Sequence, residues 1–302
     1  MIEKTQSEIG LIPAEDSHSI LLSIARGLKS NHTRVHPVTV APLCLSLIKR
    51  VIFSDDAPFR TKAGVFGFVS RLGIDWTRHL SCNMRETVIP EFCDAFKAVC
   101  ESSASADVDS QALGFCAETA LFFGLQCDEL AAVSGEKMIQ EALSMPPLAL
   151  VQISKYLSFH EPDMSVWESI AQRVERDIHS FSAQNLVSLL GSFQNSGVSC
   201  AHLIEKMCEF LPTSSATMGF NDCVSSLEFV SLADPDSIRS EKVVTFARSV
   251  QRRITILMVS SKSPVLSTQI ARILESMKRL ALPPISPLVP FISSPNAQFQ
   301  IS

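Results

Sequence analysis

Three apolar residues recur along this chain at a constant interval. Leu121, Leu157 and Phe193 are each 36 residues apart, and Val230 follows 37 residues later. Each lies within an apolar stretch with helical spacing, and a second helical stretch fills each interval. A helix pair that recurs at this period is typical of an α-solenoid, in which each repeat buries its apolar face against its neighbours. The pattern predicts an all-α fold, an α-solenoid of helix-turn-helix repeats with a period of about 36–37 residues.

The first helices of these repeats align better than the second helices. Phe115, Val151 and Val187 follow one another at intervals of 36, whereas in the second helices Ile170 aligns with Ile204 at an interval of 34. The N-terminal third has a longer and less regular period. An irregular all-α domain whose helices have similar lengths is therefore the alternative interpretation.

We divide the chain into four segments. Residues 1–16 lack periodicity and are predicted to be a flexible arm, and residues 17–103 form irregular helical repeats. Residues 104–282 form the regular repeat region, and residues 283–302 are a Pro-rich tail that we expect to be extended or disordered. Since no period-two alternation recurs, we expect no sheet. The predicted helices are 18–28, 37–53, 59–72, 84–100, 111–125, 134–143, 147–159, 164–179, 181–193, 199–211, 220–232, 238–257 and 265–280.

Cellular compartment is constrained only loosely. No apolar run approaches the roughly 20 residues that span a bilayer. The nine cysteines include no C-x-x-C pair, and we interpret them as buried free thiols in a reducing compartment. The first twenty residues resemble neither a signal peptide nor an Arg-rich transit peptide. Either the protein stays in the cytosol or the chain begins after a removed presequence.

Sequence motifs for catalysis are absent. The 11 glycines form neither a phosphate-binding loop nor a dinucleotide fingerprint. His32 and His36 are four residues apart, but they lie in a predicted loop next to a proline, which favours a surface loop over a metal site. No nucleophile, base and orienting group occur together. We therefore predict no catalytic residues, no metal, no cofactor and no small-molecule substrate.

Charge is distributed unevenly and indicates a possible binding surface. Residues 101–235 carry a net charge of −13, whereas residues 236–302 carry +6. Cations on successive helices of a solenoid are able to follow a phosphate backbone, so we predict RNA binding by this basic end. A solvated basic face, or one that pairs with acidic groups, is the alternative. The candidate RNA-binding residues are Arg248, Arg252, Arg253, Lys262, Arg272, Lys278 and Arg279.

One stretch of the sequence resembles a known repeat unit. Residues 181–198 read FSAQNLVSLLGSFQNSGV. This resembles the repeats of RNA-associated organellar α-solenoids, namely octotricopeptide, heptatricopeptide and RAP/FAST-kinase-like proteins. The resemblance is good over residues 147–211 and fainter over 111–145 and 220–257. The RAP domain that often ends such proteins is not recognisable here.

The resemblance implies a function without a catalytic module. We expect a non-catalytic helical-repeat subunit of a mitochondrial ribonucleoprotein, active in RNA editing, RNA processing or the ribosome. It would dock protein subunits of a larger complex and contact RNA phosphates at its basic C-terminal end. The predicted docking ends are the helix over 18–28 and the Pro-rich tail. The alternative is a pure protein–protein scaffold of the HEAT or armadillo type without RNA contact, and a cytoplasmic location is the alternative to the mitochondrion.

Overall fold

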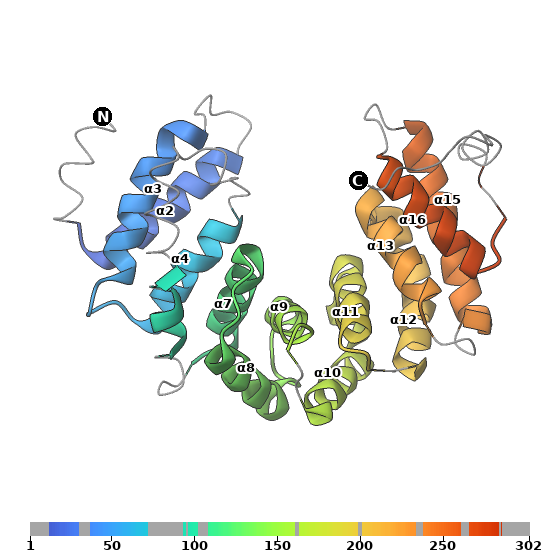
Figure 1. Cartoon of the computed structure of the whole chain (residues 1–302), viewed down its shortest axis with the longest axis horizontal. Helices are drawn as coiled ribbons and strands as arrows, with labels where there is room; N and C mark the ends of the chain where they lie inside the picture. The colour runs from blue at the N-terminus through green and yellow to red at the C-terminus, as the bar shows by residue number, and fades with distance from the viewer. Residues whose placement is uncertain are drawn as a thin grey trace. The chain divides into compact units, whose positions relative to one another are not determined.

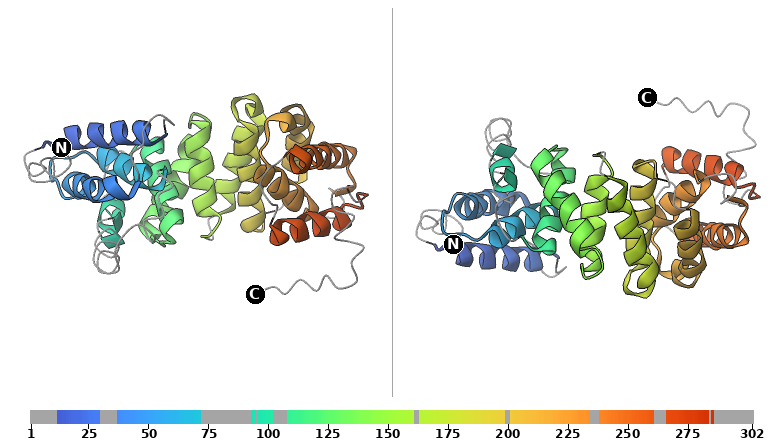
Figure 2. Two further views of the ribbon diagram at one scale, coloured as in Figure 1. Left: turned by 90° about the horizontal axis from the view of Figure 1, so that it is seen from above. Right: turned by 90° about the horizontal axis from the view of Figure 1, so that it is seen from below.

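The computed structural model shows a chain whose described secondary structure is entirely helical, which confirms the predicted all-α class (Figures 1 and 2). The structure describes residues 12–29, 37–71, 93–94, 96–101, 108–160, 163–198, 201–233, 238–260, 266–283 and 285. Within these ranges no strand occurs, and no helix combines the length and apolar character needed to cross a bilayer.

The N-terminal helices are α2 (Ala14–Lys29), α3 (Pro37–Ile52), α4 (Phe59–Arg71), α7 (Ser110–Phe123), α8 (Asp128–Glu141) and α9 (Pro147–Leu157). The C-terminal helices are α10 (Met164–Arg176), α11 (Ala183–Asn195), α12 (Ala201–Ser214), α13 (Phe220–Ser231), α15 (Glu241–Ser260) and α16 (Ser267–Arg279), with short 3-10 turns at Ile178–Ser180 and Ser215–Thr217.

The chain divides into two compact units, Met1–Tyr156 and Leu157–Ser302. In the first unit α2, α3 and α4 pack on one another, and α4 packs on α7. Its core contains Phe66 and Phe96, whose rings meet edge to face with centroids 4.9 Å apart. Such aromatic pairs stabilise a core beyond the area that they bury.

The second unit has helices in two layers. Helices α11, α13 and α16 are successive neighbours in one layer, and α10, α12 and α15 are successive neighbours in the other. Contacts of α11 with α12 and of α13 with α15 join the layers. Trp167 of α10 and Phe193 of α11 are both buried, with ring centroids 5.1 Å apart. Helices α11, α12, α13 and α15 thus bury apolar residues against a neighbour of their own layer and against one of the other layer.

The burial pattern corrects the register of the first helices. Leu157, Phe193 and Val230 are almost fully buried, as predicted, but Leu121 is only half-buried. The fully buried equivalent in α7 is Ala120, so the interval to Leu157 is 37 residues. Helix α7 ends at Gly124, whose left-handed backbone (φ 64°) closes the helix. The side chain of Leu121 lies in this last turn.

The predicted two-residue drift of the second helices was wrong. Ile204 is only half-buried, and Met207 takes the buried position that corresponds to Ile170, an interval of 37. Both helix series therefore keep a period of 36–37 residues from α7 to α13. Two sets of equivalent buried residues in the second helices are Leu130, Val166 and Leu203, and Ser134, Ile170 and Met207. The next buried pair, Val243 and Ala247 of α15, follows after a longer interval of 40 residues.

The predicted segment ends differ from the described elements. Helix α2 already begins at Ala14, inside the predicted arm over 1–16, and residues 1–11 lie outside the described residues. Of the predicted tail over 283–302, only Pro283 and Ile285 are described, and Ile285 is buried. The predicted boundary at 103/104 also lies outside the described residues. The boundary between the two compact units follows Tyr156 in the sequence.

Candidate functional site

The predicted basic residues fall on the last two helices of the second unit. Arg248, Arg252 and Arg253 lie on α15, and Arg272, Lys278 and Arg279 lie on α16. Lys262 lies outside the described residues. Both helices pack on α13, and a hydrogen bond from the Gln251 amide to the Pro283 carbonyl links α15 to the segment after α16.

Helix α15 presents two of these arginines to solvent. Its buried stripe includes Phe246, Val250 and Ile254, which pack toward α12 and α13. Arg248 and Arg252 are one turn apart on the opposite face, and both are exposed. Neither guanidinium forms an ion pair with a residue in the described part of the chain. The two side chains are therefore available to an external anion.

Arg253 and Arg272 form hydrogen bonds or ion pairs within the protein. The Arg253 Nε donates to the carbonyl of Met218 at 3.2 Å, and this side chain is half-buried. Arg272 of α16 pairs with Glu228 of α13, with Nε donating to Oε2 at 3.0 Å. The seven residues consequently do not form one uniform surface of unpaired charge.

Arg279 also forms an ion pair within the protein, with a residue of its own helix. Arg279 donates from Nε to Glu275 Oε1 at 3.1 Å, one turn earlier on the same helix. Lys278 is exposed on α16. The strongest remaining candidates for anion contact are thus Arg248 and Arg252, with Lys278 as a third cation.

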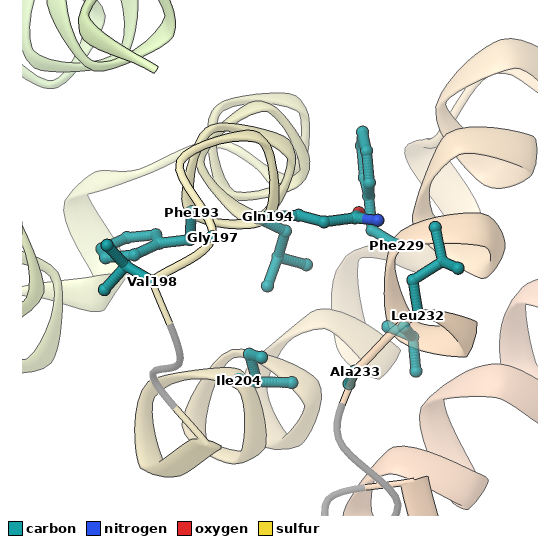
Figure 3. Close-up of a pocket in the computed structure, with 10 residues that line it drawn as sticks. Phe193, Gln194, Gly197, Val198, Ile204, Phe229, Leu232 and Ala233 are labelled. Carbon is teal, nitrogen blue, oxygen red and sulfur yellow. The ribbon is translucent and has the colours of Figure 1, made fainter. Parts of the chain in front are cut away.

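A pocket of about 300 Å³ opens between the ends of α11 and α13 and the first turn of α12 (Figure 3). The described residues that line it are mostly apolar. The buried side chains of Leu190, Phe193 and Val230 belong to this lining, together with half-buried and exposed residues nearer its rim. The described lining residues are Leu190, Phe193, Gln194, Gly197, Val198, Ile204, Phe229, Val230, Leu232 and Ala233.

Among the described residues that line this pocket, Gln194 is the only one with an amide side chain. It extends from α11 toward Phe229 of α13 (Figure 3). Its Oε1 atom is buried and accepts no hydrogen bond from the described residues. A buried acceptor without a donor costs roughly 1–3 kcal/mol. Nothing in the sequence indicates this residue, since a glutamine near the end of a helix carries no signal of burial.

The cysteines and histidines show no catalytic arrangement in the described ranges. Burial raises the pKa of Cys44, Cys208 and Cys223 to about 12, which keeps these thiols protonated and poorly nucleophilic. Seven cysteines are described; none of them is in a disulfide, and all are buried except the half-buried Cys93. In the same ranges no group of three or more His, Cys, Asp or Glu side chains is arranged to hold a metal ion.

Comparison with known proteins gives no relative. The sequence matches no family model, and no curated protein is similar enough to count as a match. The functional conclusion therefore depends on the structure and on the repeat resemblance.

Proposed function

We propose that this protein is a non-catalytic α-solenoid subunit of a mitochondrial ribonucleoprotein that takes part in RNA editing, RNA processing or ribosome function. The solenoid part of the proposal is supported by the interval of 36–37 residues between equivalent buried residues from α7 to α13 and by the two helix layers of the second unit. The RNA and mitochondrial parts are supported by the resemblance of residues 147–211 to organellar RNA-associated repeats.

The proposed RNA contact rests mainly on two arginines of α15 that form no ion pair within the described residues. Arg248 and Arg252 are exposed, one turn apart and unpaired within the described part of the chain. Two guanidinium groups at this spacing are well suited to adjacent phosphates, because each donates several hydrogen bonds in a rigid plane. Glu241 is the only acidic residue on α15, and it lies in the first turn.

Binding of this kind would be weak and tolerant of sequence. Phosphate contacts position a nucleic acid but do not read its bases. Each contact releases counterions, so affinity falls as salt concentration rises. Sequence choice in the complex would then come from partner subunits or from base pairing within the RNA.

Two matched double variants test this proposal. R248Q/R252Q removes the free pair, whereas R272Q/R279Q removes two arginines that are paired within the protein. We expect the first variant to reduce RNA crosslinking in the native complex. It should also lower the slope of log affinity against log salt by about 1.4, at 0.7 per phosphate on a single strand. The second variant should leave both quantities close to those of the wild type. Equal effects of the two variants would contradict the proposal.

The second candidate function is a protein scaffold of the HEAT or armadillo type without RNA contact. It is favoured by the internal pairing of Arg253, Arg272 and Arg279, which leaves less free positive charge than the sequence suggests. If R248Q/R252Q loses a protein partner while co-purified RNA is unchanged, the scaffold is the better description.

Localisation provides a separate test. The resemblance favours the mitochondrion, and the cytoplasm is the alternative. Imaging of the protein tagged at its C-terminus and expressed from its native start codon, together with a matrix marker, would separate the two. A purely cytoplasmic signal would leave the solenoid architecture intact but would remove the mitochondrial context.

A further inference from the structure

The pocket between α11, α12 and α13 has the properties of a binding site that is separate from the arginines of α15 (Figure 3). Its volume of about 300 Å³ is at the lower end of the range for ligand pockets. Such a pocket accommodates one ring system rather than an extended molecule. Buried Leu190, Phe193 and Val230 give it an apolar lining.

The Gln194 amide adds one specific polar requirement. Its Oε1 atom is buried without a donor from the described residues. Pairing with a ligand requires this oxygen to turn toward the pocket, and the broad terminal torsion of a glutamine side chain permits such a rotation. A ligand with one suitably placed N–H or O–H group would satisfy the acceptor and remove its desolvation penalty.

These features distinguish between the possible occupants. An aliphatic side chain would fill the space but leave the Gln194 carbonyl unpaired. A nucleobase has several donors and acceptors around its ring, and among the described lining residues only Gln194 has a side chain that pairs with them. An aromatic ring with a single donor satisfies both the apolar lining and the one acceptor.

We propose that this pocket binds the indole ring of a tryptophan presented by a partner protein, with the indole N–H donating to Gln194 Oε1. The inference rests on the proposed role of the protein as a docking subunit. Tryptophan is among the residues that most often act as buried anchors of protein interfaces, because a large rigid ring is desolvated at little entropic cost. Partner docking would therefore be anchored at α11 and α13, whereas RNA would contact α15.

The first experiment uses two small probes and measures their dissociation constants by ligand-observed NMR. Indole carries the N–H donor, and 1-methylindole has nearly the same shape without it. We expect indole to bind the wild-type protein about fivefold more tightly, which corresponds to a net hydrogen bond of about 1 kcal/mol. Equal dissociation constants for the two probes would overturn the assignment of Gln194 as the acceptor.

Two variants separate the hydrogen bond from the shape of the pocket. Gln194→Met keeps the length of the side chain but removes the acceptor. The ratio of the dissociation constants of 1-methylindole and indole should therefore fall to about one. Gln184→Met is the matched control on the same helix, where the glutamine is exposed, and should keep the preference. Ile204→Trp places a large ring at the rim and should weaken both probes together. Unchanged binding in Ile204→Trp would show that the probes bind elsewhere.

A third probe distinguishes a partner protein from a free small molecule. N-acetyltryptophanamide carries the same indole attached to a peptide backbone. We expect it to bind with an affinity similar to that of indole, since the occupant is a side chain. Exclusion of N-acetyltryptophanamide while indole binds would overturn the partner assignment and indicate a small-molecule pocket. None of these measurements involves RNA, so their outcome is independent of the RNA proposal.

Discussion

The hydroxyl group of Tyr156 engages both backbone groups of Cys127. It accepts a hydrogen bond from the Cys127 N–H at 3.1 Å and donates one to the Cys127 carbonyl at 2.9 Å. Cys127 directly precedes α8, and Tyr156 is the penultimate residue of α9. One buried hydroxyl therefore links the start of α8 to α9. It satisfies the buried Cys127 N–H, and it adds a second donor to the Cys127 carbonyl, which also accepts from the Ala131 N–H at 3.1 Å.

Removal of this hydroxyl should destabilise the protein measurably. Tyr156→Phe keeps the ring but leaves the Cys127 N–H unpaired, whereas the Cys127 carbonyl keeps its hydrogen bond from the Ala131 N–H. We therefore expect a loss of about 1–3 kcal/mol in the free energy of unfolding. Urea unfolding followed by circular dichroism measures this loss. The control is Ser144→Ala, which removes an exposed hydroxyl contact to Glu141 and should change the same quantity by less than about 0.5 kcal/mol. A loss below 1 kcal/mol for Tyr156→Phe would show that water replaces the hydroxyl.

Stability should fall at alkaline pH because of buried thiols. Burial raises the pKa of Cys208 from 9.0 to about 12, so the folded state keeps a proton that the unfolded state releases. The stabilisation from this thiol is complete below pH 9 and is lost as the pH rises toward 12. The expected slope is at most about 1.4 kcal/mol per pH unit for each such thiol. Urea midpoints between pH 8 and 11 should fall, and the fall should be shallower in Cys208→Ala. An identical pH slope in this variant would contradict the prediction.

The corrected register predicts unequal costs for two leucines in the original 36-residue series. Leu157 is almost fully buried and Leu121 only half-buried. Leu157→Ala should cost about 2–5 kcal/mol in the free energy of unfolding, and Leu121→Ala about 1–2 kcal/mol. Phe159→Ala is the control, because this side chain is 59% exposed and should contribute little. Equal costs for the two leucines would restore Leu121 as the true repeat position.

Helix boundaries were predictable where capping residues mark them. The starts of α9 at Pro147, of α10 after Asp163 and of α13 after Gly219 were predicted to the residue. Proline suits a first helical position, and Asp163 accepts a hydrogen bond from the backbone N–H of Ser165. The start of α8 was predicted six residues too late. Asp128 and Glu129 in its first turn favour a helix start, but the low hydrophobicity of this stretch concealed it.

The register and the binding surfaces were harder to derive from the sequence. Ile204 and Met207 are both apolar, so composition does not indicate which of them a neighbouring helix buries. Arg272 is 44 residues from Glu228, and only the packing of α16 on α13 brings the pair together. The sequence therefore overestimated the free positive charge at the C-terminal end. The pocket depends on side chains from three helices and has no local signal.

Close packing of α11 on α13 supplies the last prediction. Gly191 lies against the ring of Phe229, and a Cβ atom at position 191 would lie 2.6 Å from the Phe229 Cζ atom. Gly191→Ala should therefore cost about 1–3 kcal/mol in the free energy of unfolding through overpacking, although alanine favours the helix. Phe229→Leu removes the ring, so the double variant should recover part of this cost, with a coupling energy of about 0.5–3 kcal/mol.

The control for this double-mutant cycle is Gly197, a glycine that is required for its backbone conformation and not for close packing. Gly197 has a φ of 69°, and nothing lies within 4 Å of a Cβ atom at this position. Gly197→Ala should cost about 1–2 kcal/mol through backbone strain alone, and Phe229→Leu should not relieve it. Chemical denaturation of the six proteins, namely the wild type, three single variants and two double variants, gives both coupling energies. A coupling energy near zero at Gly191 would mean that α11 and α13 move apart to accommodate the methyl group. A large coupling energy would confirm that Gly191 sets the separation of α11 and α13.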